Sequence, residues 1–282
     1  MFNSDLKNES IAKLEKSIKN YDQKRSLVEK NSVKLFNMRK KCGDEVITPV
    51  ESFINTLANT PKEFDKSFKA YKAEFKIFRN LIKKFQAKSA DANFVAGKTA
   101  TAGIAAGVGT AALMPAAAMA IATTFGTAST GAAIAGLSGA AATNAALAWL
   151  GGGTLLAGGG GMAGGSAFLA LAGPIGLGIG AVGVIGGGLL ASSKNKEIAE
   201  KANKERAKIE TALATLNASH LEIKKLLELT SKHFKGILHF LKDLSSTAPT
   251  DYNDYTNAHK DKLGAMVNHI EALSMLINKK VK

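Results

Sequence analysis

Two glycine-containing motifs could bind nucleotide phosphates. The segment ANFVAGKT, residues 92–99, is a relaxed phosphate-binding loop with alanine in place of the first glycine. The segment GIGAVG, residues 178–183, matches the dinucleotide pattern GxGxxG. Each motif needs a preceding β-strand and a following helix, which aim backbone amides at phosphate. Neither segment has that context or a suitably placed acidic residue, so we do not expect nucleotide binding at either one.

Other residues that carry chemistry are sparse. The five histidines show no metal-ligand spacing along a helix, and no nucleophile is accompanied by a base and an acid. His220 and His233 lie near apolar heptad positions, which predicts packing roles for them. The single Cys42 excludes an intramolecular disulfide and is expected to be a partly exposed thiol. The sequence therefore predicts no enzyme, no cofactor and no metal site.

The charges divide the chain into three regions. Residues 99–193, a run of 95, contain no Asp, Glu, Lys, Arg or His and hold 24 of the 28 glycines; we call them the apolar run. Residues 1–98 carry 21 Lys and Arg against 12 Asp and Glu, and residues 194–282 carry 16 against 11. We predict an N-terminal amphipathic helical arm (1–98), a Gly/Ala-rich membrane-inserting region (99–193) and a C-terminal helical arm (194–282).

The N-terminal arm has the spacing of amphipathic helices. Apolar residues recur at steps of three and four over residues 11–35, and Gly43 and Pro49 predict the end of that helix. Residues 50–59 would form a short apolar piece. Residues 60–63, Thr-Pro-Lys-Glu, predict a capping box that starts a second helix. That helix carries an apolar stripe that must pack against a neighbour: Phe64, Phe68, Tyr71, Phe75, Phe78, Ile82 and Phe85.

The C-terminal arm follows the same design. One heptad frame predicts a helix over about residues 194–245, and the turn Ser-Ser-Thr-Ala-Pro-Thr-Asp, residues 245–251, separates it from a last helix. The apolar positions of the long helix are Ala202, Ile209, Leu213, Leu216, Ile223, Leu227, Phe234, Ile237, Leu241 and Leu244. The predicted fold class is all-α: an amphipathic helical bundle or coiled-coil arms around a Gly/Ala-rich transmembrane hairpin region.

The apolar run is long enough for several membrane spans, since one span needs about 20 apolar residues. Candidate spans cover residues 100–124, 128–150 and 166–191. Basic residues on both sides favour an even number of crossings, two or four, with both arms in the cytoplasm. A soluble form with a buried hairpin and a flexible linker remain alternatives.

Small residues at four-residue spacing predict close helix packing within the apolar run. The predicted packing and pore residues are Gly103, Gly107, Asn144, Trp149, Gly160, Gly164, Gly176, Gly180, Gly183 and Gly187. Trp149 is expected near a membrane interface. The lysines that flank the run, Lys98, Lys194 and Lys196, are candidate anion-binding residues.

Residues 126–165, GTASTGAAIAGLSGAAATNAALAWLGGGTLLAGGGGMAGG, resemble a Gly/Ala-rich hairpin found in many bacterial membrane-associated proteins. The layout is similar to that of α-helical pore-forming toxins and the apolipoprotein L group. It is also similar to that of membrane effectors in anti-phage defence systems. One such system is Hailong, whose effector is gated by a short DNA ligand. These resemblances imply pore or channel activity and transfer no functional residues.

We therefore expect an oligomeric, pore- or channel-forming membrane effector whose basic arms control insertion or gating. Its expected partners are the lipid bilayer, copies of itself, and an anionic ligand (nucleotide, oligonucleotide or anionic lipid) or an activating protein. It would lie in a bacterial inner membrane with cytoplasmic arms, or in the cytoplasm until activated. The alternatives are a non-conducting membrane-tethering or remodelling scaffold and a helical protein that binds nucleic acid or nucleotides.

Overall fold

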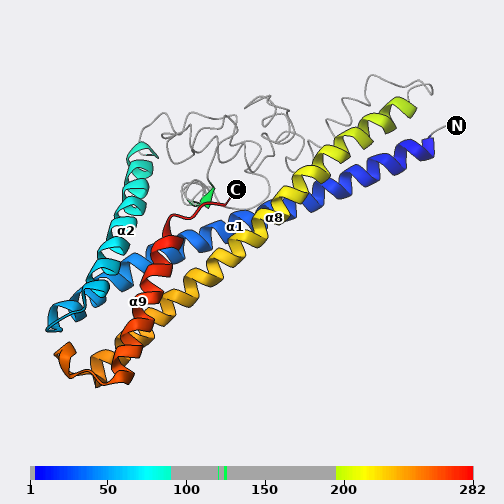
Figure 1. Ribbon diagram of the computed structural model, residues 1–282. Helices are drawn as coiled ribbons and strands as arrows, with labels where there is room; N and C mark the ends of the chain where they lie inside the picture. Colours follow the sequence, from blue (N-terminus) through cyan, green and yellow to red (C-terminus); the bar gives the residue numbers. More distant parts are fainter. Residues whose placement is uncertain (1–3, 90–119, 121–123, 126–194, 282) are drawn as a thin grey trace.

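The computed structural model describes residues 4–89, 120, 124, 125 and 195–281, and these residues form helices (Figure 1). The elements are α1 (Ser4–Thr56), α2 (Lys62–Ser89), α8 (Asn195–Thr247), the short 3-10 helix η4 (Tyr252–Asp254) and α9 (Asn257–Ile277). The described part contains no β-strand, only two isolated bridges. The predicted all-α class is confirmed for this part, whereas the predicted transmembrane hairpin lies almost wholly outside it.

The two long helices, α1 and α8, run side by side in the same direction (Figure 1). Asn203 donates a hydrogen bond to Ser10, 193 positions earlier, and Asn31 lies 3.3 Å from His220, 189 positions later. A nearly constant difference in residue number along the pair means that the helices are parallel. The predicted start and end of the C-terminal long helix are confirmed to within two residues.

The two shorter helices, α2 and α9, are also parallel to each other. Ser67 donates to Glu271 and Asn278 donates to Glu74, and both pairs are 204 positions apart. The fold is thus two helical hairpins, α1–α2 and α8–α9, placed next to each other and pointing the same way (Figure 1).

Helix length determines the overall shape. α1 and α8 have 53 residues each, which spans about 80 Å, whereas α2 has 28 and α9 has 21. The N-terminal halves of α1 and α8 therefore continue beyond the shorter helices as a two-helix stalk (Figure 1).

The predicted break at Gly43 and Pro49 is wrong, because α1 continues through both. A Cβ added at Gly43 would lie 1.6 Å from the Phe75 ring, so this glycine admits an aromatic side chain of α2 against the backbone of α1. Val46 and Val50 continue the buried stripe. Each such apolar burial contributes about 1.5–3 kcal/mol, and together they offset the helix-breaking cost of Gly and Pro, about 1 and 3 kcal/mol.

The predicted separate piece at residues 50–59 and the predicted capping box are likewise corrected. α1 includes residues 50–56, and the Thr60 hydroxyl donates backward to the Leu57 carbonyl at 2.7 Å, closing the end of α1. The Pro61 carbonyl accepts from the amides of Phe64 and Asp65, the third and fourth residues of α2. The Thr60 hydroxyl therefore serves the turn before α2, and the Pro61 carbonyl accepts the first bonds of the helix.

The turns of the two hairpins are joined directly. The Ala58 amide donates to the Thr250 carbonyl at 2.8 Å, and the Tyr252 amide donates to the Ala58 carbonyl at 3.0 Å. Asn59, at a left-handed φ of 55°, donates from its side chain to both carboxylate oxygens of Asp251. These bonds hold the two hairpins in register at the end far from the stalk.

The predicted apolar stripes form one core. The aromatic positions of α2 from residue 64 to 78 are at most 3% exposed, and the Tyr71 hydroxyl donates to the Cys42 carbonyl of α1. In α8 every seventh residue is buried: Ala202, Ile209, Leu216, Ile223, Thr230, Ile237 and Leu244. Both stripe predictions are confirmed for these residues.

Candidate functional site

Most of the predicted site residues lie outside the described part of the chain. These are Gly103, Gly107, Asn144, Trp149, Gly160, Gly164, Gly176, Gly180, Gly183, Gly187, Lys98 and Lys194. Lys196, on the first turn of α8, has an exposed side chain 4.0 Å from Glu200. Among the helices that the structure describes, none has the length and hydropathy required for a membrane span.

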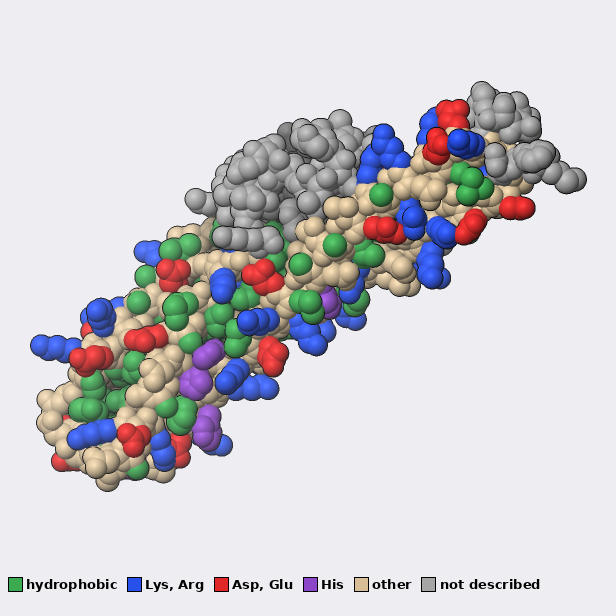
Figure 2. All heavy atoms as spheres, turned by 45° about the vertical axis from the view of Figure 1, so that its right-hand side comes forward, with side chains coloured by type: hydrophobic (Ala, Val, Ile, Leu, Met, Phe, Trp, Pro, Cys, Tyr) green, Lys and Arg blue, Asp and Glu red, His purple; other side chains and the backbone are tan. Residues whose placement is uncertain are grey.

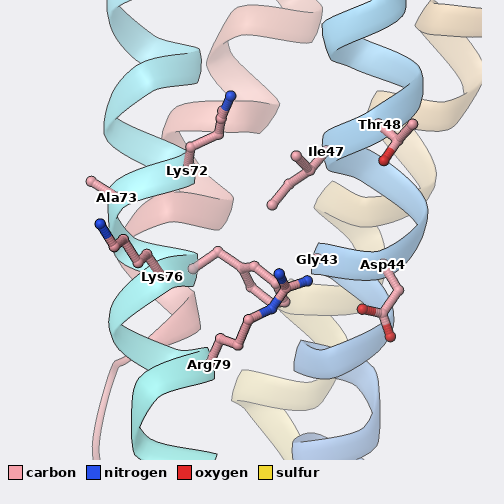
Figure 3. Close-up of a pocket in the computed structure, with 9 residues that line it drawn as sticks. Gly43, Asp44, Ile47, Thr48, Lys72, Ala73, Lys76 and Arg79 are labelled. Carbon is pink, nitrogen blue, oxygen red and sulfur yellow. The ribbon is translucent and has the colours of Figure 1, made fainter.

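A cavity of about 520 Å³ between α1 and α2 is lined by three cationic side chains of α2, Lys72, Lys76 and Arg79 (Figure 3). These side chains do not converge. Lys72 pairs with Glu51 at 2.5 Å, Lys76 turns away from α1, and Arg79 extends toward Gly43. The cavity is therefore a poor anion site.

The basic character of the surface is dispersed over both hairpins. On the face shown in Figure 2, blue and red side chains alternate along the molecule. Several pairs lie one helical turn apart, such as Lys13 with Glu9 at 2.6 Å and Lys201 with Glu197 at 3.0 Å. Exposed pairs of this kind contribute little to stability and describe a solvated surface. On this face the charges do not form a single-sign patch for nucleic acid.

Two histidines meet across α8 and α9. The Nδ1 atoms of His233 and His269 are 2.9 Å apart, so one neutral ring donates to the other. Burial lowers the pKa of both rings, and the charges of Lys232 and the neighbouring imidazole act in the same direction on His233. Gly236 makes room for the His269 ring, because a Cβ there would lie 2.5 Å from Nε2.

This histidine pair was not predicted, because its members are 36 positions apart on different helices. Within the described residues, no group of three or more His, Cys, Asp or Glu side chains could hold a metal ion. His220, the other histidine predicted to pack, lies at the α1–α8 interface beside Asn31.

The site with the most specific geometry is at the C-terminal end of the chain. Residues 278–281, which we call the tail, follow α9 and lie between the helices and the described part of the apolar run (Figure 1). We call the tail together with its four partners the tail junction; the partners are Arg39, Glu74, Thr124 and Phe125.

The tail is bound to both N-terminal helices. Asn278 donates from its side chain to the Glu74 carbonyl at 2.9 Å and to the Glu74 carboxylate at 2.8 Å. Arg39 of α1 donates from Nη2 to the Lys279 carbonyl at 2.6 Å. Because Arg39 is fully buried, this charge-assisted bond is formed away from water.

On its other side the tail contacts the apolar run. The Val281 amide donates to the Thr124 carbonyl at 2.8 Å, and Val281 forms a parallel bridge with Phe125. Val281, Phe125 and Ala120 are at most 1% exposed and belong to the same apolar core as the helices.

No family model, curated protein or solved structure matches this chain.

The electrostatics of the tail junction are unusual for a helical core. Burial lowers the pKa of Arg39 to about 10, and burial together with the Arg39 charge lowers the pKa of Lys280 to about 8. Both cations thus lie in poorly solvated places, and the Arg39 charge adds to the cost of charging Lys280. The junction was not predicted from the sequence. One signal for it was the position of Arg39, which lies seven residues after the buried Ser32 and seven before the buried Val46 and so places a cation on the buried face of α1.

Cys42 does not offer a reactive thiol. The prediction of a partly exposed side chain is wrong, because Cys42 is fully buried at a core position of α1. Burial raises its pKa to about 12, so the thiol stays protonated at neutral pH.

Proposed function

We propose that this protein is an oligomeric membrane effector that inserts its apolar run into a bilayer and forms a pore or channel. The observation that carries the proposal is a charge-free run of 95 residues in a chain whose helices already form a core of their own. The bundle buries its own apolar stripes between α1, α8, α2 and α9. Ala120 and Phe125 of the run belong to that core as well.

The composition of the run favours assembly rather than simple anchoring. Glycine pairs four residues apart, such as Gly160 with Gly164 and Gly176 with Gly180, allow helices to pack closely in lipid. The net charge of +14 favours anionic head groups at the membrane surface. An anionic ligand or an activating protein would supply the trigger.

The test is dye release from vesicles that contain an anionic phospholipid, combined with flotation to measure membrane association. We expect the protein to float with the vesicles and to release the dye with a steep dependence on protein concentration. Association without release would support the non-conducting scaffold instead. Absence of association would contradict both.

A quadruple variant tests the packing role of the glycines. Replacing Gly160, Gly164, Gly176 and Gly180 with leucine is expected to keep vesicle association and abolish release, because leucine prevents close helix approach. Gly264→Leu is the control, since Gly264 lies on α9 with no atom within 4 Å of an added Cβ. Unchanged release by the quadruple variant would contradict the close-packing mechanism.

A further inference from the structure

We infer that the tail, Asn278–Val281, is a latch that fastens the apolar run to the helical bundle and must detach before the run leaves it. This inference rests on the proposed membrane insertion for its consequence. The latch itself is a property of the protein in solution and has its own test.

The first step of the argument is that the tail is held firmly by the bundle. It follows directly from α9, whose last residue, Ile277, is fully buried. Asn278 and the Lys279 carbonyl are then bound by Glu74 of α2 and Arg39 of α1. Three helices therefore fix the position of these few residues.

The second step is that the tail contacts the described part of the run directly. The contact includes a hydrogen bond from the Val281 amide to the Thr124 carbonyl and the bridge that pairs Val281 with Phe125. Both paired side chains are buried in the core that they share with the helices. Removing Val281 would take one apolar side chain from this core and leave the Thr124 carbonyl without this donor.

The third step is that electrostatic repulsion opposes docking of the tail. Arg39 donates to the Lys279 carbonyl, one residue before Lys280, so docking of the tail brings the buried Arg39 charge close to a second cation. Docking is thus favoured by apolar burial and hydrogen bonds and disfavoured by charge repulsion. A contact balanced in this way can be released by a modest competing interaction, such as an anionic surface that binds the tail lysines.

The contact is tested first in solution, without membranes. Phe125→Cys and Val281→Cys are combined in a Cys42→Ala background and oxidised, and cross-linking is followed on non-reducing gels. Extended segments joined by a bridge lie about 4.7–4.9 Å apart, close to the Cβ–Cβ separation of a disulfide. We expect a disulfide in most molecules.

The matched control pairs Val281→Cys with Leu6→Cys in the same background. Leu6 is 45% exposed and lies 33 residues before Arg39 on the same helix, about 50 Å away. This pair should not close within a molecule. Cross-linking of the Phe125 pair no faster than the control would overturn the inference.

The latch role is tested by removing the tail after Asn278. Circular dichroism should show retained helix content, because the truncation begins after α9 ends. In the Phe125→Cys, Cys42→Ala protein, we expect the truncation to raise the rate of maleimide labelling at position 125 at least tenfold. An unchanged labelling rate would overturn the inference whatever the protein does to membranes.

Vesicle leakage then separates the latch from the proposed function. The oxidised Phe125→Cys, Val281→Cys protein should release less dye than the same sample after reduction, and the truncated protein should release dye faster than the full chain. If the reduced and oxidised forms leak equally, the latch does not control insertion. If neither form nor the unmodified chain leaks, the proposed pore activity fails, while the cross-linking and labelling results still decide the latch contact.

Discussion

His233 and His269 face each other across α8 and α9 with their Nδ1 atoms 2.9 Å apart. Their rings meet edge to face with centroids 5.0 Å apart, and the His269 ring also lies 5.8 Å from the ring of Phe240. The neutral forms of the two imidazoles share one proton between the facing nitrogens. Protonation of both rings would place two donors against each other.

This pair predicts that the protein loses stability in mild acid. Because the pKa of both imidazoles is lowered in the folded state, the unfolded chain binds more protons as the pH falls below about 6.5. The free energy of unfolding should therefore decrease between pH 7.5 and pH 5. Urea denaturation at several pH values measures this slope.

Replacing both His233 and His269 with asparagine should flatten that slope in the same measurement. Replacing His239, an exposed histidine elsewhere on α8, should change the slope less. An equal effect of the two substitutions would show that the pair is not responsible for the acid sensitivity.

A second prediction concerns Gly43, where the ring of Phe75 touches the backbone of α1. Gly43→Ala should destabilise the fold by about 1–3 kcal/mol, because the new methyl group overlaps the ring and one of the two helices must shift. Combining it with Phe75→Leu should make the effect of the alanine smaller. Thermal and urea unfolding of the single and double variants measure the coupling.

Gly264 supplies the opposite case within the same protein. It lies inside α9 with open space around its Cβ position, so Gly264→Ala should stabilise the fold by about 0.5–1 kcal/mol through helix propensity alone. If both alanine substitutions changed stability in the same direction, the close contact with Phe75 would not govern Gly43.

A third prediction concerns Asn59, which joins the two turns. Asn59→Ala should lower the free energy of unfolding by about 1–2 kcal/mol. The substitution removes two hydrogen bonds to Asp251, and alanine is less favourable than asparagine at the left-handed φ of this position. Asn59→Gly should lose less, because glycine accepts a φ of 55°. Chemical denaturation of both variants tests the order, and equal losses would assign the whole effect to the side chain.

A fourth prediction concerns Lys280 in the tail junction. Its pKa is lowered to about 8, so charging the amine costs more in the folded state than in the unfolded chain. This penalty is fully present at pH 7, where the lysine carries its proton in both states. Lys280→Met should therefore stabilise the fold at pH 7, by about 1–3 kcal/mol. The difference between this variant and the original chain should shrink as the pH rises from 8 through 10.5, because the lysine becomes neutral first in the folded state and then in the unfolded state.

Lys279→Met is the control for Lys280, because the Lys279 side chain is exposed while only its carbonyl accepts from Arg39. It should leave stability nearly unchanged at every pH. A pH-independent effect of Lys280→Met would indicate that apolar burial of the methionine, rather than removal of a buried charge beside Arg39, stabilises the variant.

The sequence by itself determined that the arms are helical and which faces they bury. Side chains such as Phe64, Phe68 and Ile237 repeat at steps of three, four and seven, and this periodicity is a local property of a helix. The length of the charge-free run is equally local, since it requires only the order of residue types. These features did not need the partner surfaces to be known.

The tertiary structure alone decided three further features. α1 runs through Gly43 because the ring of Phe75 fills the space that a side chain would occupy. The long helices are parallel, and this direction follows from turn-to-turn and helix-to-helix contacts rather than from the heptads of either helix. The tail junction joins Arg39, Phe125 and Val281, which are far apart in the chain. Contacts between distant residues depend on how packed faces fit together, and no spacing within one segment encodes that fit.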